Sequence, residues 1–427
     1  MDINTLYNHY LESTGVCTDT RKISEGCFFV ALKGDNFDAN TFAQAALNAG
    51  AKYALIDNPE YQVPGKTLLV QDSLTALQQL ARHHRHTLGL PVIALTGSNG
   101  KTTTKELINA VLSAKYKTTA TIGNLNNHIG VPLTLLSFTK DTEIGIVEMG
   151  ANHQKEIEFL CTIAEPNFGY ITNFGKAHLE GFGGVEGVIK GKSELYAYLS
   201  AHTKTAFVNL DDPIQADKTK DLPRYTFSAG KHNSDVTVDA IEANPMVSLY
   251  YNNFHIQSHL IGIYNAANIT AAIAIGYHFR VPDNLIKQAI EGYIPANNRS
   301  QITEKNGNKI ILDAYNANPS SMAAAIANFI QLDAAHKVAF LGDMFELGTE
   351  SPEEHRKVIA LLEDETDVET YFVGKDFYAN SVHLPHFHFF ETFDSLKEYL
   401  HGKAYTNNTI LIKGSRGMAL ERTLDLL

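Results

Sequence analysis

The sequence predicts a three-domain α/β protein, and three observations support this prediction. The chain has 427 residues, which is too long for one small core. Short apolar runs alternate with helical stretches along most of its length, as they do in βαβ units. One glycine-rich turn lies directly between such a run and a helix, where a phosphate-binding loop would be placed.

Residues 1–88 are predicted to form a small α/β domain at the N-terminus. The apolar runs at 27–32 and 53–56 are typical of short strands. Between them, apolar residues in 42–47 recur with helical spacing.

Residues 89–296 are predicted to form the central domain, around a parallel sheet that carries the phosphate loop. The run 92–95 indicates a buried strand, and a helix is expected from Lys101 to about Lys115. After Asp221 the pattern becomes rich in strands, with a hairpin whose turn is Asn252-Asn253. Further strands and a later helix are expected at 143–147, 168–171, 206–209 and 265–279.

The stretch 294–298 is typical of a linker, and residues 297–427 are predicted to form a Rossmann-like C-terminal domain. Its expected strands alternate with helices and lie at 310–312, 338–341, 371–373 and 410–412.

Composition excludes several classes of protein. The formal net charge of -12, from 35 basic and 47 acidic residues, argues against a general nucleic-acid binder. Three widely spaced cysteines fit neither a disulfide framework nor a zinc site. No apolar stretch is long enough for a membrane span. We therefore expect a cytoplasmic protein that acts on small molecules, and nothing in the sequence requires more than a monomer.

The strongest local signal is the turn after the 92–95 run. Backbone N–H groups at the start of the helix would receive phosphate oxygens, Lys101 would reach the outer phosphates, and the Thr102 hydroxyl would bind Mg²⁺. The full Walker A pattern would need glycine in place of Leu95, so the loop is a shortened one. An ordinary glycine turn that caps a helix is the alternative, but the strand-turn-helix context favours nucleotide binding. The predicted nucleotide-binding loop consists of Thr96, Gly97, Ser98, Asn99, Gly100, Lys101, Thr102 and Thr103.

Two further polar features follow predicted strands. Glu148 directly follows the apolar run of the 143–147 strand. A lone acid there is usually only a polar residue at the end of a strand. Near a phosphate loop, however, it is a candidate ligand for Mg²⁺. The glycine-rich segment 173–183 is expected to be an ordered active-site loop, although His178 within it would by itself more often be a surface histidine. A nucleotide loop alone leaves ATPase, GTPase, kinase and ligase open.

Taken together, these segments resemble the Mur ligase family, and the missing first glycine is part of that family's pattern. The resemblance covers all three predicted domains. It implies an ATP-dependent ligase of peptidoglycan synthesis that activates a carboxylate as an acyl phosphate. The segments that carry it are the phosphate loop, 121–127, the strand ending at Glu148, 177–179, 264–268, 313–319 and 341–344.

Four stretches are similar to the family members that add D-alanyl-D-alanine to UDP-N-acetylmuramoyl-tripeptide. The sequence departs from this pattern at two places. Ala39-Asn40 replaces a commoner Gly-His or Ala-His pair, so the contacts to uridine stay undetermined. Residues 262–265 lack the usual basic residue, so the contacts to adenosine stay undetermined. The four stretches are 18–21 with 28–38, 150–153, 178–183 and 413–416.

Three alternatives remain. A Mur ligase that adds the third amino acid is the nearest. A ligase like folylpolyglutamate synthase should lack a UDP-binding N-terminal domain, and a switch or motor ATPase should hydrolyse ATP without an amine acceptor.

The resemblance implies two Mg²⁺ ions. Thr102 and Glu148 would hold one, and His178 the other. Lys192 corresponds to a lysine that is carbamylated in this family, which would make it an anionic oxygen ligand; the alternatives are a solvated helix lysine and a role for Lys190 instead. The implied catalytic residues are Lys101, Lys192, His178 and Arg299, the last meeting the γ-phosphate from the third domain.

The resemblance also implies contacts to the substrates. Asn265 and Asn268 would lie beside adenine and Asp313 beside ribose, with helix capping as the alternative for Asn265. Domain closure would then assemble the site. The implied substrate residues are Asn124, Asn126 and Asn127 for the muramoyl-peptide, Thr20, Arg21 and Lys33 in the UDP domain, and Asn316, Asn318, Ser415 and Arg416 for D-alanyl-D-alanine.

Overall fold

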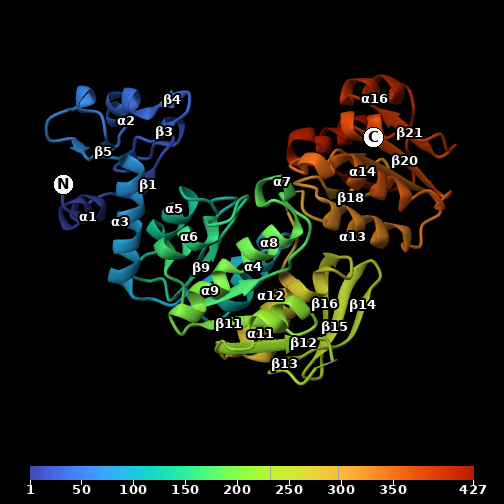
Figure 1. Cartoon of the computed structure of the whole chain (residues 1–427), viewed down its shortest axis with the longest axis horizontal. Helices are drawn as coiled ribbons and strands as arrows, with labels where there is room; N and C mark the ends of the chain where they lie inside the picture. Colours follow the sequence, from blue (N-terminus) through green and yellow to red (C-terminus); the bar gives the residue numbers. More distant parts are fainter. Residues whose placement is uncertain (231, 297) are drawn as a thin grey trace.

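The computed structural model describes residues 1–230, 232–296 and 298–427. It confirms the predicted fold class, a mixed α/β protein whose three larger sheets are wholly or mostly parallel. The N-terminal and C-terminal parts lie at opposite ends of the central part (Figure 1). The boundary predicted at residue 297 lies outside the described residues. In the described part of the chain, no helix is both long and apolar enough to cross a bilayer.

The N-terminal part is built on a four-stranded parallel sheet of order β1-β2-β5-β6. Strand β2 is buried along its whole length, which agrees with its uninterrupted apolar sequence. Its elements are α1 (Ile3–Leu11), β1 (Val16–Cys17), β2 (Phe28–Val30), the hairpin β3 (Lys33–Gly34) and β4 (Phe37–Asp38), α2 (Ala43–Asn48), β5 (Tyr53–Ile56) and β6 (Thr67–Leu69).

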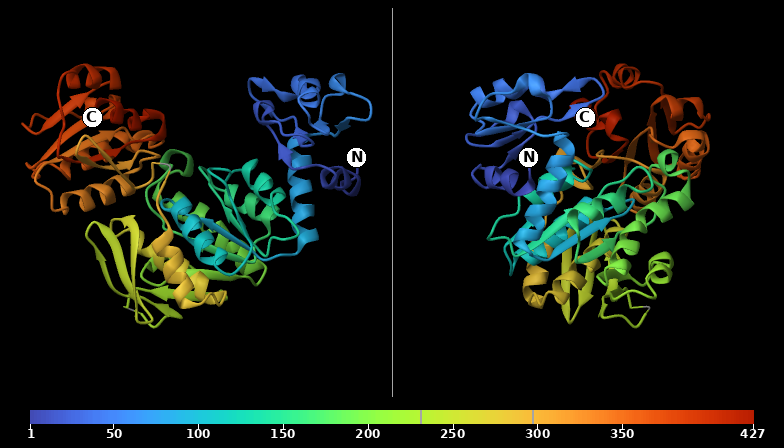
Figure 2. Two further views of the ribbon diagram at one scale, coloured as in Figure 1. Left: turned by 180° about the vertical axis from the view of Figure 1, so that it is seen from behind. Right: turned by 60° about the vertical axis from the view of Figure 1, so that its left-hand side comes forward.

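Helix α3 (Ser73–Leu88) joins the N-terminal part to the central part (Figures 1 and 2). It begins with Asp72, whose side chain accepts from Thr75 N, and ends at Gly89 in the left-handed conformation. His84 is buried between Tyr7 Oη (3.0 Å) and the carbonyl oxygen of Phe138 (2.9 Å). A single helix is thus bonded to residues on both sides of the junction.

The central part contains a seven-stranded parallel sheet of order β13-β12-β11-β10-β7-β9-β8. Alternate residues of β7 pack into two different cores, Val92 and Ala94 on one face and Ile93 and Leu95 on the other. The strands are β7 (Val92–Thr96), β8 (Thr118–Ala120), β9 (Ile144–Glu148), β10 (Phe168–Ile171), β11 (Thr205–Asn209), β12 (Arg224–Ser228) and β13 (Val236–Thr237).

Helices cover both faces of this sheet. Helix α4 packs with α11 and α12 on one face, while α5, α6 and α9 lie on the other. The helices are α4 (Lys101–Ser113), α5 (Gly130–Leu136), α6 (Glu156–Ala164), α7 (Leu179–Phe182), α8 (Val185–Lys192), α9 (Glu194–Ala201), α10 (Pro213–Lys218), α11 (Asn265–His278) and α12 (Asp283–Gly292).

A separate antiparallel sheet follows, and its hairpin confirms the predicted turn. Asn252 and Asn253 both have positive φ, 45° and 66°, as a tight hairpin turn requires. Its strands are β14 (Asp239–Ala243), β15 (Met246–Tyr251) and β16 (Phe254–Ile261). The strands β12 and β13 also come after Asp221, but they extend the parallel sheet instead.

The C-terminal part has a six-stranded sheet of order β17-β18-β22-β19-β20-β21, in which only the β17–β18 pair is antiparallel. All four predicted strands are present. The elements are β17 (Gln301–Lys305), β18 (Asn308–Asp313), α13 (Pro319–Ile330), β19 (Lys337–Gly342), α14 (Ser351–Ala360), β20 (Val368–Val373), α15 (Lys375–Ala379), β21 (Phe387–Phe390), α16 (Phe393–Leu400) and β22 (Thr409–Lys413).

Candidate functional site

A cavity of about 1270 Å³ lies between the central and C-terminal parts. The central part contributes the loop after β7, the end of β9 and the start of α11, and the C-terminal part contributes residues from Arg299 to Ala324 together with Lys413. From the N-terminal part only Leu74 and Gln78 of α3 reach it. The site lies at the carboxyl ends of parallel strands, where ligands bind in open α/β sheets.

The loop from Gly97 to Gly100 is braced from behind by the segment after β10. Ser98 N–H donates to the Asn173 carbonyl oxygen (3.0 Å), and Asn99 N–H donates to Asn173 Oδ1 (3.1 Å). Thr172 Oγ1 donates to the Asn99 carbonyl oxygen (2.6 Å). These bonds fix the loop shape and occupy the N–H groups of Ser98 and Asn99. The N–H groups at the start of α4 are then the ones that would bind phosphate.

Gly97→Ala is expected to disrupt the loop. The residue has φ +142°, and an added Cβ would lie 2.0 Å from Thr172 Oγ1 and 2.9 Å from its backbone nitrogen. We expect the free energy of unfolding to fall by about 1–3 kcal/mol and nucleotide binding to be lost, measured by thermal unfolding and by ATP titration. Gly123→Ala is the control, because Gly123 also has positive φ (+57°) but no atom within 4 Å of the added Cβ. Equal effects of the two substitutions would contradict this account.

Lys101 begins α4 at the edge of the cavity. Its Nζ donates to the carbonyl oxygens of Gly97 (2.8 Å) and Ser98 (3.3 Å). Burial lowers the pKa of Lys101; the Glu148 carboxylate opposes this shift and the Arg299 guanidinium adds to it. Glu148 of the central part and Arg299 of the C-terminal part are therefore both close enough to the Lys101 amine to change its pKa.

Thr102 and Glu148 lie together, as predicted for a metal site. Thr102 Oγ1 donates to Glu148 Oε2 (2.9 Å), and Asn126 Nδ2 donates to Glu148 Oε1 (2.8 Å). The alignment of β7 with β9 creates this proximity, since Leu95 and Glu148 are register partners. A hydroxyl and a carboxylate beside a phosphate loop are oxygen donors of the kind Mg²⁺ prefers, so these residues fit the ion.

Lys192 is completely buried, which excludes the solvated-lysine alternative. Its Nζ donates to the Ala151 carbonyl oxygen (2.9 Å) and lies 4.8 Å from the centre of the Phe182 ring. Burial, reinforced by the positive charge of Lys101, lowers the pKa of Lys192 well below its ordinary value, and Glu156 and Glu194 oppose this only in part. The competitor Lys190 is exposed.

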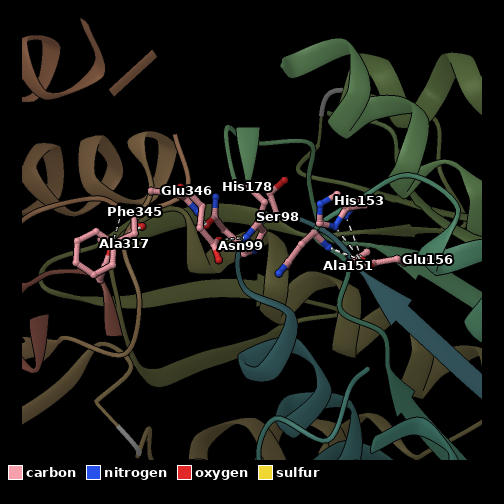
Figure 3. Close-up of polar contacts among 12 residues, drawn as sticks. Ser98, Asn99, Ala151, His153, Glu156, His178, Ala317, Phe345 and Glu346 are labelled. Atoms are coloured by element: carbon pink, nitrogen blue, oxygen red, sulfur yellow. Dashed lines mark hydrogen bonds and ion pairs between the residues drawn. The ribbon is translucent and has the colours of Figure 1, made fainter. Parts of the chain in front are cut away.

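His178 lies in the loop before α7 and lines the cavity. Its Nδ1 contacts a carboxylate oxygen of Glu346 from the C-terminal part (Figure 3). Burial lowers the pKa of His178; Glu346 opposes this, while Lys101 and Lys192 add to it. His178 is therefore near the two lysines of the predicted site and is not an isolated surface histidine.

The predicted nucleotide-side residues also line the cavity. Asn268 accepts from Thr104 Oγ1 (3.0 Å) and donates to Asn265 Oδ1 (2.8 Å), which ties the start of α11 to the phosphate-loop helix. The Asn265 side chain does not cap α11; it donates to the Ile261 carbonyl oxygen (2.8 Å).

From the C-terminal part, Arg299 and Asp313 face the same cavity. The Arg299 guanidinium stacks 3.5 Å from the centre of the Tyr315 ring. Asp313 forms a 2.6 Å ion pair with Lys413, its register partner on β22. Stacking on Tyr315 therefore fixes the Arg299 guanidinium, and pairing with Lys413 fixes the Asp313 carboxylate, on this wall of the cavity.

The four residues predicted for the dipeptide pocket divide into two pairs. Asn316 and Asn318 line the cavity, and Asn318 Nδ2 donates to Asn99 Oδ1 of the phosphate loop (2.7 Å). Ser415 is buried, and its Oγ accepts from Phe345 N–H (2.9 Å). Arg416 is largely exposed and pairs with Glu421 (3.5 Å). Neither Ser415 nor Arg416 reaches the cavity.

The other predicted substrate residues divide in the same way. Asn124, Asn126 and Asn127 line the cavity, whereas Thr20, Arg21 and Lys33 do not. Within the N-terminal part, Arg21 pairs with Asp19 (2.8 Å) and Lys33 with Asp57 (2.8 Å).

The ion pair between Lys33 and Asp57 is supported by Asn40. Asn40 donates to Asp57 Oδ1 (2.7 Å) and accepts from Asp57 N–H (3.0 Å). Asn40 therefore orients the carboxylate that holds Lys33.

Sequence reasoning missed several residues of the site. Asn173 lay in the predicted active-site loop 173–183, and Tyr315 and Lys413 lay inside segments that carry the family resemblance, but no role was assigned to them individually. Glu346 lies just beyond one such segment, 341–344, and nothing in its local sequence marks it. A contact between residues 168 positions apart arises only from the fold.

Family models match three successive parts of the chain. The model described as Mur ligase family, catalytic domain, matches residues 12–85. The Mur ligase middle domain matches residues 95–276, and the Mur ligase, glutamate ligase domain, matches residues 298–416.

Individual proteins match over nearly the whole chain. The UDP-N-acetylmuramoyl-tripeptide–D-alanyl-D-alanine ligase of Bacillus subtilis (strain 168) is 36% identical over 443 residues, covering 99% of this chain and 96% of the relative. A crystal structure of MurF from Acinetobacter baumannii gives a TM-score of 0.86 at 32% identity and covers 99% and 98% of the two chains. That of MurF ligase from Thermotoga maritima in complex with ADP gives 0.83 at 26% identity, covering 98% and 97%.

Proposed function

Since the chain belongs to the Mur ligase family, we infer that it uses ATP to join D-alanyl-D-alanine to UDP-N-acetylmuramoyl-tripeptide. The product is the UDP-muramoyl-pentapeptide precursor of peptidoglycan. The observation that carries this conclusion is the cavity between two domains, with a phosphate loop on one wall and Asn316, Asn318 and Arg299 on the other. A cavity of this kind can hold a nucleotide and two further reactants together.

The reaction needs activation, because the oxide of a carboxylate is a poor leaving group. The terminal carboxylate of the tripeptide would attack the γ-phosphorus of ATP, forming an acyl phosphate and releasing ADP. The amine of D-alanyl-D-alanine would then attack the acyl carbon, forming the amide, while phosphate leaves and the amine loses a proton. Lys101 and Arg299 would offset the negative charge that accumulates around the transferred phosphoryl group.

We propose two Mg²⁺ positions at this site. Thr102 and Glu148 would hold the first and His178 the second. The ions would supply positive charge that lowers the repulsion between the attacking carboxylate and the triphosphate. The Thr102–Glu148 contact and the position of the partly buried His178 on the cavity wall support this assignment.

Lys192 is proposed to carry a carbamate. The burial that lowers the pKa of Lys192 favours its neutral amine. A neutral amine can add to the carbon of CO₂ and release one proton, which replaces the buried amine by an anionic oxygen donor. That donor would complete the ligands of the second ion.

The remaining assignments complete the proposal. The nucleoside of ATP would contact Asn265, Asn268 and Asp313. The muramoyl-peptide would contact Asn124, Asn126 and Asn127. The UDP group would bind to the N-terminal domain, with Lys33. We propose a monomer, because the phosphate loop and the wall that faces it come from the same chain. We place the enzyme in the cytoplasm, the compartment that supplies ATP.

An isotope experiment tests the chemical course. With ¹⁸O in the terminal carboxylate of the tripeptide, one labelled oxygen should appear in the released phosphate, and ADP should be the nucleotide product. Mass spectrometry of phosphate and nucleotides measures both. Parallel incubations with single amino acids in place of D-alanyl-D-alanine test the alternative that the protein is a Mur ligase that adds the third amino acid. AMP with pyrophosphate, or unlabelled phosphate, would rule out the acyl phosphate.

A further inference from the structure

His178 and Glu346 meet across the boundary between the central and C-terminal parts (Figure 3). Both residues have left-handed backbone conformations, with φ of 53° and 62°. Such conformations cost free energy for residues other than glycine and persist where the surroundings impose them. A backbone bond lies beside the side-chain contact, since Glu180 N–H donates to the Glu346 carbonyl oxygen (3.2 Å).

The loop that presents Glu346 is held rigidly. It follows β19, and its backbone N–H groups bond to buried side chains: Met344 N–H donates to His355 Nε2 (3.1 Å) and Phe345 N–H to Ser415 Oγ (2.9 Å). The preceding Asp343 carboxylate accepts two further backbone N–H groups at 3.0 and 2.9 Å. The position of Glu346 is therefore set by the core of its own domain.

The contact determines which ring nitrogen of His178 carries the proton. A carboxylate accepts hydrogen bonds, so Nδ1 must donate to it, and in the neutral ring Nε2 then keeps its lone pair. A histidine that binds a metal commonly donates its other ring N–H to a carboxylate in this way, which fixes both the tautomer and the orientation of the ring.

We propose that Glu346 is a positioning residue for the second metal ion: it holds His178 in the Nδ1–H tautomer, so that Nε2 is the ligand atom. The inference rests on the role proposed above for His178. Because Glu346 belongs to the C-terminal domain and His178 to the central domain, this metal site reaches full affinity only when the two domains are docked. ATP activation is thereby linked to the domain that takes the incoming amine.

A plain contact between domains is the competing explanation, and a neighbouring ion pair provides a matched control. Lys176 Nζ pairs with Glu354 Oε1 (2.6 Å), joining the same two domains without contacting His178. Lys176→Met removes that pair, while Glu354 keeps its bond to Lys357 (3.1 Å). If Glu346 acts only by docking the domains, the Lys176 and Glu346 variants should behave alike.

The first measurement is binding of Mn²⁺, used in place of Mg²⁺ and followed by electron paramagnetic resonance. The full-length protein is titrated with a non-hydrolysable ATP analogue and UDP-muramoyl-tripeptide present. Glu346→Ala is expected to weaken the second Mn²⁺ by about 10- to 100-fold. Glu346→Gln should recover part of the affinity, because its amide oxygen can still accept from Nδ1. Lys176→Met should leave the affinity for the second Mn²⁺ ion unchanged.

The second measurement is the ¹⁵N spectrum of the histidine side chains, in which the His178→Asn variant identifies the His178 signals. The wild-type protein should show a protonated Nδ1 and an unprotonated Nε2, and Glu346→Ala should lose this preference. The Glu346 side chain is about half exposed (52%), so its replacement is not expected to unfold the protein.

The outcomes separate the two ideas. If His178→Ala leaves both Mn²⁺ affinities unchanged, the proposed metal role of His178 fails. If His178→Ala weakens the second ion but Glu346→Ala does not, the inference about Glu346 is overturned while the proposed function stands. Equal weakening by Lys176→Met and Glu346→Ala, or a wild-type His178 protonated on Nε2, also overturns it.

Discussion

Lys101→Ala is expected to lower the rate of ligation by about 10²- to 10³-fold, the loss typical of removing one donor that stabilises charge in a transition state. The amine lies at the start of α4 beside Glu148 and Arg299, where the outer phosphates of a nucleotide on this loop would lie. The substitution removes the Lys101 bonds to the Gly97 and Ser98 carbonyl oxygens. The loop keeps its bonds to Thr172 and Asn173, so the fold should survive.

Release of phosphate in the presence of all three substrates measures the rate, and circular dichroism with thermal unfolding checks the fold. Lys140→Ala removes an exposed lysine of the same domain and should change neither quantity. A folded Lys101→Ala protein that turns over near the wild-type rate would remove the phosphate loop from the mechanism.

Lys192→Ala is expected to be nearly inactive, and short carboxylates such as formate or acetate should restore part of its activity. Loss of an anionic ligand would remove several kcal/mol of charge stabilisation, a rate loss of about 10²-fold or more. The substitution also leaves a buried space where the side chain packed on Phe182. A small carboxylate in that space would return an oxygen ligand to the metal.

Rescue is measured as ligation rate against carboxylate concentration, with chloride at the same ionic strength as the reference. Lys190→Ala, two positions away on the same helix and exposed, should behave as the wild type in both conditions. Full activity of Lys192→Ala without added carboxylate would exclude the carbamate.

The sequence predicted those features that depend on neighbouring residues. The phosphate loop is one, because the strand, the turn and the helix start all lie within 92–103, and local spacing encodes their geometry. The hairpin turn at Asn252-Asn253 is another, since left-handed φ values are a property of these residues themselves. Glu148 was found because the end of a buried strand is visible as the end of an apolar run.

Features that depend on tertiary packing were not visible. A lysine in a Lys-x-Lys stretch reads as solvated, and only the packing of α8 beneath Ala151 and Phe182 shows that Lys192 is buried. Ser415 was assigned to the dipeptide, but its hydroxyl is inside the C-terminal domain and holds the backbone of Phe345. The sequence indicated only that the region after Asp221 is rich in strands. Periodicity does not reveal which sheet a strand joins, so the place of β12 and β13 in the parallel sheet was not predicted.

Helix α3 has a thermodynamic consequence. Its buried His84 bonds to α1 on one side and to the Phe138 carbonyl oxygen on the other, and Arg85 donates to the Ala164 carbonyl oxygen (3.1 Å) and Asn167 Oδ1 (2.7 Å). If either domain melted alone, His84 would lose its partner on that side, Tyr7 or the Phe138 carbonyl oxygen. Apolar side chains of α3 that pack in the shared core would also be exposed to water. We therefore expect the N-terminal and central domains to unfold as one cooperative unit, although each has its own sheet.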